Sequence, residues 1–390
     1  MPGFEIIGKE EQKAVSEVFE KGGCLFRYGF EFMRNNSYQV IDFEKQFAQF
    51  SGAKYAQATT SGTASLFAVN KIHGIGKGDE VITQSFTFVA TVEAIYETGA
   101  TPIITEVDET LNMDPTDLER KITKKTKAIW VVHMLGVPAQ MDEIRKIAQK
   151  YKLLLFEDTC QALGAVYRNK YCGTLADAGA FSFDFGKTLT TGDGGMIITD
   201  KKNTYLKARA YCDHGHEDNP KYLRGEDTAS MSGFNFRMME LQGAVGLVQL
   251  KKLPRALKKV KDNYLKLQGL LSNIKDIKFR KIPSGAVEVG DSLIFFLKTQ
   301  EKRTKVSNYL SKKGIAFKLL PGAVKWHFAG RWDHIWNQIP YYRGKKYIEL
   351  WPKSYDLLQR SIAIPIMIKM TEQRIQSIAQ LIIDAIKHAI

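Results

Sequence analysis

The segment FSFDFGKTLTTGDGG, residues 181–195, places a single lysine, Lys187, between an apolar run and a glycine-rich turn. A phosphate-binding loop would need a glycine five residues before Gly186, where Phe181 stands, and a dinucleotide fingerprint would need one at Ile197. Neither phosphate motif therefore explains the segment. A lysine in such a turn can instead attack a carbonyl carbon and carry a proton.

Two other features of the sequence can complement a reactive lysine. Asp158 ends the apolar run LLLFED, so we expect its carboxylate at the mouth of a buried strand. Ser-Gly-Thr at residues 61–63 precedes an apolar helical pattern, where free N–H groups and the helix dipole favour a phosphate. Taken alone, each feature is more simply interpreted as a helix cap or, for Asp158, as a solvent-facing acid.

Taken together, the three features describe one ligand. A cofactor with a phosphate, a ring nitrogen that needs a carboxylate and an aldehyde that needs a lysine is pyridoxal 5'-phosphate. We expect Gly62 and Thr63 to bind the phosphate, with a further hydroxyl from Ser182. Asp158 would pair with the pyridinium nitrogen, and Lys187 would form the Schiff base and move the proton.

The elements that must position these residues follow from the hydrophobic pattern between about residues 55 and 200. Four apolar runs predict buried strands: GDEVITQ, ATPIITEVD, TKAIWVVHM and YKLLLFEDT. The stretches TFVATVEAIYETG, PTDLERKIT and MDEIRKIAQKYK predict amphipathic helices. This alternation predicts an α/β fold with a mostly parallel central sheet flanked by helices. Ligands of such sheets bind at the carboxyl ends of the strands, where His133, Asp158 and Ser182 are expected.

The chain after residue 250 has a different pattern. We expect a long basic helix there, then strands in SLIFFLKT and SIAIPI, and helices in KRTKVSNYLSKKG and TEQRIQSIAQLIIDAIKHAI. The sequence thus predicts two domains. A large cofactor-binding domain would span residues 1–250, and a smaller α+β domain would span residues 251–390.

Charge is distributed unevenly between these two parts. Residues 251–390 hold 28 lysines and arginines against 10 acids, whereas residues 1–250 hold 28 against 32. A basic segment can bind nucleic acid, an acidic membrane surface or an anionic substrate. Because the lysines of LKKLPRALKKVKDNYLKLQGLL lie opposite Leu and Val on a helical pattern, a solvated helix face is the preferred interpretation. No nucleic-acid-binding motif is found, and no nucleic-acid partner is expected.

The remaining composition favours a cytoplasmic globular protein. The first residues, MPGFEIIGKEEQKAV, predict no secretory signal, and no run of about 18 apolar residues predicts a membrane span. Four widely spaced cysteines without a CxxC pair indicate a reducing compartment. The tightest pair of metal-ligating residues, His214 and His216, has no partner motif, so no metal site is expected.

The order and spacing of the motifs resemble the DegT/DnrJ/EryC1 family of sugar aminotransferases nearly from end to end. The matching stretches are SGTASL, SFTFVATVEAI, VVHMLGVPAQMDEI, EDTCQALGA, FSFDFGKTLTTGDGG, the DHG of YCDHGH, and GFNFRMMELQGAVGLVQL. The resemblance implies a fold-type I aminotransferase. One departure, GDGG for the commoner GEGG, is conservative. Some relatives carry histidine in place of the lysine and are dehydratases, so Lys187 implies a transaminase.

The resemblance also implies roles for single residues. Lys187 corresponds to the lysine of the internal aldimine, and Asp158 to the partner of the pyridinium nitrogen. Gln161 corresponds to a polar residue against the cofactor ring, and Phe88 to the aromatic residue on its other face. The residues that correspond to phosphate contacts are Gly62, Thr63, Ser182 and, from a neighbouring subunit, Asn235. The last correspondence implies a homodimer with shared active sites.

Three stretches, MPGFEIIGKEE, CLFRYGFEFMRNN and DHGHEDN, resemble the branch of 8-amino-3,8-dideoxy-manno-octulosonate transaminases. This implies amino transfer from L-glutamate to 8-oxidised Kdo, an acidic sugar of bacterial lipopolysaccharide. The alternative is an aminotransferase for a nucleotide-linked keto-deoxysugar. A more distant alternative is a non-catalytic regulatory or nucleic-acid-binding relative.

The acidic sugar requires a cation near its carboxylate. Arg27 and Arg34 lie in the segment that separates this branch, and a guanidinium group can bind a carboxylate through two parallel hydrogen bonds. Both are therefore candidate substrate residues. The competing interpretation is that they are surface arginines paired with nearby acids such as Glu31.

Overall fold

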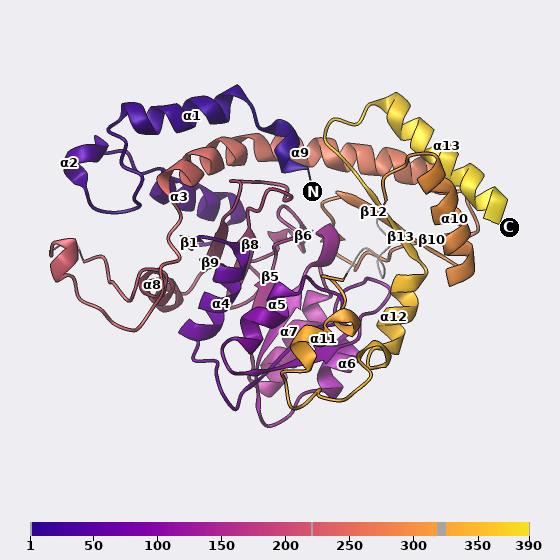
Figure 1. Ribbon diagram of the computed structural model, residues 1–390, viewed down its shortest axis with the longest axis horizontal. Helices are drawn as coiled ribbons and strands as arrows, with labels where there is room; N and C mark the ends of the chain where they lie inside the picture. Colours follow the sequence, from indigo (N-terminus) through magenta and orange to yellow (C-terminus); the bar gives the residue numbers. More distant parts are fainter. Residues whose placement is uncertain (1, 220, 318–324, 390) are drawn as a thin grey trace.

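The computed structural model describes residues 2–219, 221–317 and 325–389 (Figure 1). A seven-stranded sheet forms its centre, with the strands in the order β1 (Tyr55–Thr59), β9 (Gly195–Thr199), β8 (Ala178–Ser182), β5 (Leu154–Asp158), β4 (Thr126–Val132), β2 (Glu80–Gln84) and β3 (Thr101–Thr105). Strand β9 pairs antiparallel with β1 on one side and with β8 on the other, whereas β8, β5, β4, β2 and β3 pair in parallel. The expected α/β fold with a mostly parallel sheet is confirmed.

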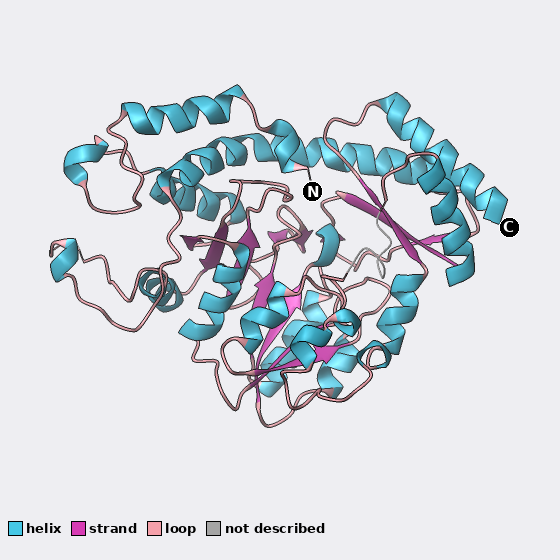
Figure 2. Ribbon diagram, in the orientation of Figure 1, coloured by secondary structure: helices cyan, strands magenta, loops and turns pink. Residues whose placement is uncertain are grey.

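Both faces of the sheet are covered because its strands are apolar on both sides (Figure 2). In β4, Trp130 packs with the side chains of α4 (Gly62–Ile72), α5 (Ala90–Tyr96) and α8 (Lys202–Tyr211). Its neighbours Ile129 and Val131 face the other way, toward α6 (Pro115–Arg120) and α7 (Met141–Tyr151). Successive side chains of a strand point to opposite faces, so a continuous apolar run is what a two-sided core requires.

The N-terminal elements pack on a long helix. They are η1 (Gly3–Ile6), α1 (Lys9–Glu20), α2 (Glu31–Arg34) and α3 (Gln39–Ser51), and the long helix is α9 (Glu240–Leu271). Helix α3 also packs on the strands β1, β8 and β9 of the sheet. Figure 1 shows α1 running beside α9, in agreement with their contacts. Glycines permit the close crossing of α3 and α9, since a Cβ on Gly246 would lie 2.7 Å from the ring of Phe43.

The C-terminal part contains a second sheet, in the order β10 (Ile277–Phe279), β12 (Ser292–Leu297) and β13 (Ser361–Pro365). It packs against α10 (Gln300–Lys312), α13 (Glu372–Ala389) and the second half of α9. A third small sheet joins β6 (Val166–Tyr167) to β7 (Lys170–Tyr171) and β11 (Ala286–Val287). Short 3-10 turns occur at η2 (Met134–Gly136) and η3 (Arg224–Glu226).

One C-terminal segment packs on the large sheet instead. It comprises η4 (Ala329–Arg331), α11 (Asp333–Trp336), η5 (Tyr347–Glu349) and α12 (Pro352–Gln359). Its Trp332 and Trp336 share a core cluster with Phe86 and Val89. A division into two domains at residues 250/251 remains our proposal, and that position falls inside the continuous helix α9.

The basic pattern of α9 is that of an amphipathic helix. Leu253, Val260 and Leu267 are buried, whereas Lys258 and Lys259 are exposed. Among the residues that the structure describes, no helix is both long and apolar enough to cross a membrane.

Candidate active site

The carboxyl ends of two neighbouring strands bring the first candidate residues together. Asp158 is the last residue of β5 and Ser182 the last of β8, and these strands pair in parallel with Asp158 opposite Ala180. The loops after both strands therefore open at the same edge of the sheet. This is the edge at which open α/β sheets bind ligands.

The carboxylate of Asp158 is buried and only partly satisfied by the protein. Asp158 is 4% exposed. Its Oδ2 accepts a hydrogen bond from Thr91 Oγ1 at 2.7 Å, and its Oδ1 accepts one from the amide of Cys160 at 3.1 Å. Each carboxylate oxygen has two acceptor sites, so acceptor capacity remains for a ligand donor.

The first turn of α4 lies directly against Ser182. A Cβ on Gly62 would lie 2.7 Å from Ser182 Cβ and 3.2 Å from Ser182 Oγ. Ser61 caps the helix by accepting a hydrogen bond from the amide of Ala64 at 3.1 Å. The earlier amides at an α-helix N-terminus have no partner within the helix, which makes this turn suited to an anion. Thr63 is exposed at the same turn.

Lys187 lies in the loop between β8 and β9 and is partly exposed. Gly194 has φ 153° there, and a Cβ would lie 2.5 Å from Thr191 Oγ1, so only glycine fits the turn without a shift. Burial raises the pKa of the Cys160 thiol well above its usual range; negative Asp158 raises it further, and positive Lys187 opposes this. The charges of Asp158 and Lys187 therefore both act on one thiol.

Phe88 and Gln161 provide two further surfaces at this edge of the sheet. Phe88 follows β2, is 41% exposed, and its ring centroid lies 5.3 Å from that of His327. Gln161 is buried, and its Oε1 has no hydrogen-bond partner in the described chain. A buried acceptor left without a partner is a feature that a bound ligand can resolve.

These residues fit pyridoxal phosphate. The first turn of α4 at Gly62 lies against the hydroxyl-bearing Ser182, the buried carboxylate of Asp158 retains acceptor capacity, and Lys187 lies in the loop that follows Ser182. Gly62, Thr63 and Ser182 would hold the phosphate, and Asp158 the ring nitrogen. The assignment of each single residue remains a prediction.

Asn235 lies in the segment before α9 and forms an isolated β-bridge with Asp213. It is exposed, and its Oδ1 accepts a hydrogen bond from the amide of Arg237 at 3.3 Å. The next residue, Phe236, accepts a hydrogen bond from the amide of Thr60 at 2.9 Å, which ties the segment to the chain before α4. An exposed amide is available to another subunit, and its contribution to a partner's site stays a prediction.

The structure places Arg27 and Arg34 in the interior. The interpretation that they are surface arginines paired with Glu31 is therefore wrong. Arg27 is 2% exposed and binds both carboxylate oxygens of Glu44. Arg34 is 1% exposed, donates to the carbonyl of Gly29 at 2.6 Å and lies 3.7 Å from a carboxylate oxygen of Glu240. A buried cation requires such pairing, and both guanidinium groups are paired with a carboxylate of the protein. Their direct contact with a substrate therefore lacks geometric support.

Two features of the site were not predicted from the sequence. The i, i+4 pair Thr87 and Thr91 within SFTFVATVEAI was a visible signal for a hydroxyl that reaches Asp158. The segment with Trp326 and His327 was not foreseeable, because it comes from the C-terminal part. It pairs with the chain around Phe88: the amide of Thr87 donates to the His327 carbonyl at 3.0 Å.

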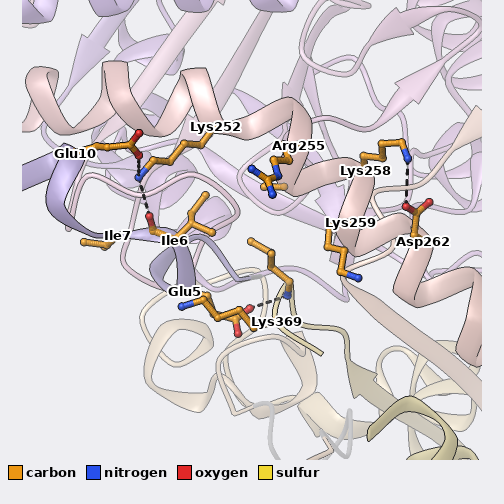
Figure 3. Close-up of a pocket in the computed structure, with 12 residues that line it drawn as sticks. Glu5, Ile6, Ile7, Glu10, Lys252, Arg255, Lys258, Lys259, Asp262 and Lys369 are labelled. Carbon is orange, nitrogen blue, oxygen red and sulfur yellow. Dashed lines mark hydrogen bonds and ion pairs between the residues drawn. The ribbon is translucent and has the colours of Figure 1, made fainter. Parts of the chain in front are cut away.

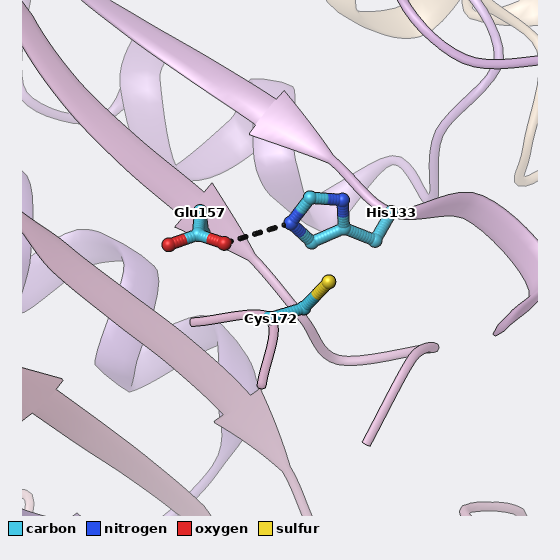
Figure 4. A group of neighbouring side chains, drawn as sticks. All are labelled: His133, Glu157 and Cys172. Carbon is cyan, nitrogen blue, oxygen red and sulfur yellow. Dashed lines mark hydrogen bonds and ion pairs between the residues drawn. The ribbon is translucent and has the colours of Figure 1, made fainter. Parts of the chain in front are cut away.

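A buried cluster of His133, Glu157 and Cys172 lies beside the site (Figure 4). The amide of Ala139 donates to His133 Nδ1 at 3.0 Å, so Nε2 carries the ring proton and donates to Glu157 at 3.0 Å. Glu157 also accepts hydrogen bonds from the amides of Gly173 and Leu175. These contacts give His133 and Glu157 a structural role that needs no ion.

A cavity of about 750 Å³ lies elsewhere, between η1, α9 and the chain after β13 (Figure 3). None of the predicted site residues lines it. Lys252 pairs there with Glu10 and Glu11, and Lys258 with Asp262, so acids offset part of the positive charge of α9.

Comparison with known proteins gives consistent matches. Residues 6–383 match the model of the DegT/DnrJ/EryC1/StrS aminotransferase family. The chain is 32% identical over 402 residues to the spore coat polysaccharide biosynthesis protein SpsC of Bacillus subtilis (strain 168), covering 98% of this chain and 96% of that protein. It is 34% identical over 281 residues to a GDP-perosamine synthase of Escherichia coli O157:H7, covering 70% and 74%. An aminotransferase structure from Psychrobacter cryohalolentis superposes with a TM-score of 0.87 at 26% identity, covering 98% and 97%.

Proposed function

Because the chain belongs to the DegT/DnrJ/EryC1/StrS aminotransferase family, we propose that it transfers an amino group from L-glutamate to a nucleotide-linked keto sugar. It is a pyridoxal-phosphate-dependent sugar aminotransferase, and the expected enzyme class and cofactor are confirmed. The non-catalytic alternative is therefore set aside. The observation that carries the proposal is the meeting of Asp158, Ser182 and the N-terminus of α4 at one edge of the sheet, where the loop with Lys187 follows Ser182.

When bound, pyridoxal phosphate supplies the carbonyl carbon that receives the donor's amino group and a ring that accepts electrons. The carboxylate of Asp158 would accept a hydrogen bond from the ring nitrogen and so keep the ring electron-poor. The N-terminus of α4 and the hydroxyl of Ser182 bind the phosphate. Lys187 would hold the cofactor covalently, and its Nζ would move a proton at the substrate carbon. Phe88 would lie against one face of the ring.

The nucleotide-linked substrate is preferred because one relative is named for such a sugar, GDP-perosamine. The structure adds an aromatic surface: Trp326 is 56% exposed, and its carbonyl accepts a hydrogen bond from the amide of Val89, the residue after Phe88, at 2.7 Å. An exposed indole beside the site offers a stacking face to a nucleotide base.

The Kdo-type substrate is not supported. Neither relative described above is a Kdo transaminase. The two residues proposed to bind the Kdo carboxylate, Arg27 and Arg34, are buried in pairs with Glu44 and Glu240. The resemblance of three short stretches to that branch therefore carries less weight than these findings.

Purified enzyme should be incubated with L-glutamate and a panel of acceptors: GDP-linked and dTDP-linked keto-deoxysugars, and 8-oxidised Kdo. Amine products should be detected by mass spectrometry, with the Lys187→Ala protein as the control. We expect a nucleotide-linked sugar to be aminated. Faster turnover of oxidised Kdo than of every nucleotide-linked sugar would reverse the substrate proposal and restore the Kdo assignment.

A further inference from the structure

A hydroxyl group from a different element holds the carboxylate of Asp158. Thr91 belongs to α5 and is 1% exposed, and its Oγ1 donates to Asp158 Oδ2 at 2.7 Å. The amide of Cys160 donates to the other oxygen, Oδ1, at 3.1 Å. Because the two donors reach different oxygens, from α5 and from the loop after β5, they fix the rotation of the carboxylate as well as its position.

A second hydroxyl lies behind the first. Thr87 Oγ1 is 2.8 Å from Thr91 Oγ1, and Thr87 is fully buried. A hydroxyl group has one proton to donate, and an ionised carboxylate can only accept. Thr91 therefore donates to Asp158 and accepts from Thr87, whose other acceptor, the carbonyl of Phe88, is farther away at 3.3 Å. The three side chains thus form a hydrogen-bond chain with one direction.

The same short segment carries the aromatic residue of the site. Phe88 follows Thr87, and its carbonyl accepts a hydrogen bond from the amide of Thr91 at 3.1 Å. The turn that presents the Phe88 ring thus also presents the hydroxyl that reaches Asp158. One element aligns the two groups that would contact the face and the nitrogen of the cofactor ring.

We propose that Thr91 is a positioning residue for amino transfer: its hydroxyl group, oriented by Thr87, holds the Asp158 carboxylate toward the ring nitrogen of pyridoxal phosphate. This inference rests on the proposed role of Asp158. Thr91 acts through that carboxylate, which it orients before the cofactor binds. The chemical consequence is a preorganised partner for the pyridinium N–H, which needs no rearrangement during the reaction.

The test compares Thr91→Val, which removes the hydroxyl at nearly constant volume, with Thr91→Ser, which keeps it. Thr98→Val is the matched control, because Thr98 is also buried. Its hydroxyl donates to the carbonyl of Ile95, near the end of the same helix, and accepts from the amide of Ala100, so both of these partners are backbone groups. Binding of pyridoxal phosphate to each apo-protein should be measured by absorption and fluorescence titration, together with kcat and thermal stability.

We expect Thr91→Val to bind the cofactor roughly 10- to 100-fold more weakly, as for loss of a hydrogen bond to a charged group. The pH dependence of the cofactor absorption should shift as well, while Thr91→Ser should be near wild type in both. Thr98→Val should lose stability only. Wild-type cofactor affinity, absorption and kcat in Thr91→Val would overturn the proposal, whatever happens to its melting temperature.

Asp158→Asn separates this inference from the proposed function. Weak cofactor binding in Asp158→Asn together with normal binding in Thr91→Val would overturn the inference alone. Normal binding in both variants would overturn the role of Asp158 as well. If Thr91 acts through Asp158, the double variant should bind little more weakly than Asp158→Asn. Fully additive losses would contradict that route.

Discussion

The backbone amide of Gly3 donates a hydrogen bond to the carbonyl oxygen of Lys187, with an N···O distance of 2.9 Å. Two residues farther along, Glu5 accepts a hydrogen bond from the amide of Ile368, just after the second sheet, at 2.7 Å. The N-terminal segment therefore links the loop of the proposed catalytic lysine to the C-terminal part of the chain. A residue far from Lys187 in sequence can thus control the position of its backbone.

Gly3→Ala should disturb this loop. A Cβ on Gly3 would lie 2.5 Å from the carbonyl oxygen of Lys187 and 2.6 Å from that of Thr188, so the loop must shift. We expect kcat to fall roughly 10- to 100-fold, as small displacements of a reacting group do. Gly8→Ala is the control, since a Cβ there meets nothing within 4 Å. Equal activity of the two variants would show that the contact does not position Lys187.

Lys187→Ala should abolish turnover, because it removes the amine proposed to hold the cofactor and to move the proton. The wild-type protein should be yellow, and borohydride should remove its absorption band and leave the cofactor attached to the peptide with residue 187. Peptide mass spectrometry provides the measurement. A borohydride adduct on a different lysine would disprove the assignment.

Gly62→Ala should weaken binding of pyridoxal phosphate. The added Cβ would lie 2.7 Å from Ser182 Cβ, which forces apart the two elements proposed to bind the phosphate. Gly269→Ala, also within a helix, meets no atom within 4 Å and should be neutral or slightly stabilising, by up to about 1 kcal/mol. Isothermal titration of the apo-proteins should show a loss of affinity in Gly62→Ala alone. Unchanged affinity there would remove Gly62 from the site.

Arg27→Met should destabilise the fold by about 3–5 kcal/mol, since it leaves Glu44 as a buried carboxylate without its cation. Denaturant unfolding provides the measurement. The double variant Arg27→Met/Glu44→Gln should recover much of this loss, because it removes the unpaired charge. If Arg27 instead binds the substrate directly, Arg27→Lys should remain stable and raise KM for the keto sugar.

The pH dependence of the same pair has a definite sign. Burial raises the pKa of Glu44 to about 7, above the ordinary 4.5 of the unfolded chain, although Arg27 opposes the shift. The folded protein therefore holds this proton more tightly, and the contribution of Glu44 to stability is lost as pH rises from about 4.5 to 7. Without Arg27 the loss should be larger and extend to higher pH, so Arg27→Met should be closer to wild type at pH 5 than at pH 8. The opposite trend would contradict a buried carboxylate.

Mixing two inactive variants tests whether Asn235 acts in a partner's site. A dimer of one Lys187→Ala chain and one Asn235→Ala chain would contain one site with both residues intact, provided that Asn235 crosses the interface. Co-expression should therefore restore activity that neither variant has alone. Absence of restoration in a verified mixed dimer would place Asn235 in its own chain's site or outside both.

Local patterns predicted the strands that build the site. The run LLLFED becomes β5 (Leu154–Asp158), and Asp158 stands at its carboxyl end as expected. Ser182 likewise ends β8 (Ala178–Ser182). Such predictions succeed because the length and polarity of a run determine where a buried strand must end. Periodicity is a property of neighbouring residues, so it can be read without a fold.

The partners of the charged and polar side chains could not be predicted from the sequence, because the fold brings them together. Nothing in the sequence distinguishes Arg27 from a surface arginine. In the structure it pairs with Glu44, which lies 17 residues farther along the chain. The carboxylate of Glu44 offsets the free-energy cost of removing the guanidinium group from water. In the same way Thr91 reaches Asp158 across 67 residues, and His327 reaches the chain around Phe88 from the C-terminal part. The sequence by itself therefore determined the strands that end near Asp158 and Ser182, the reactive residue types and the family resemblance. Only the tertiary structure decided which side chains pair, because hydrogen bonds and ion pairs depend on distances that sequence spacing does not encode.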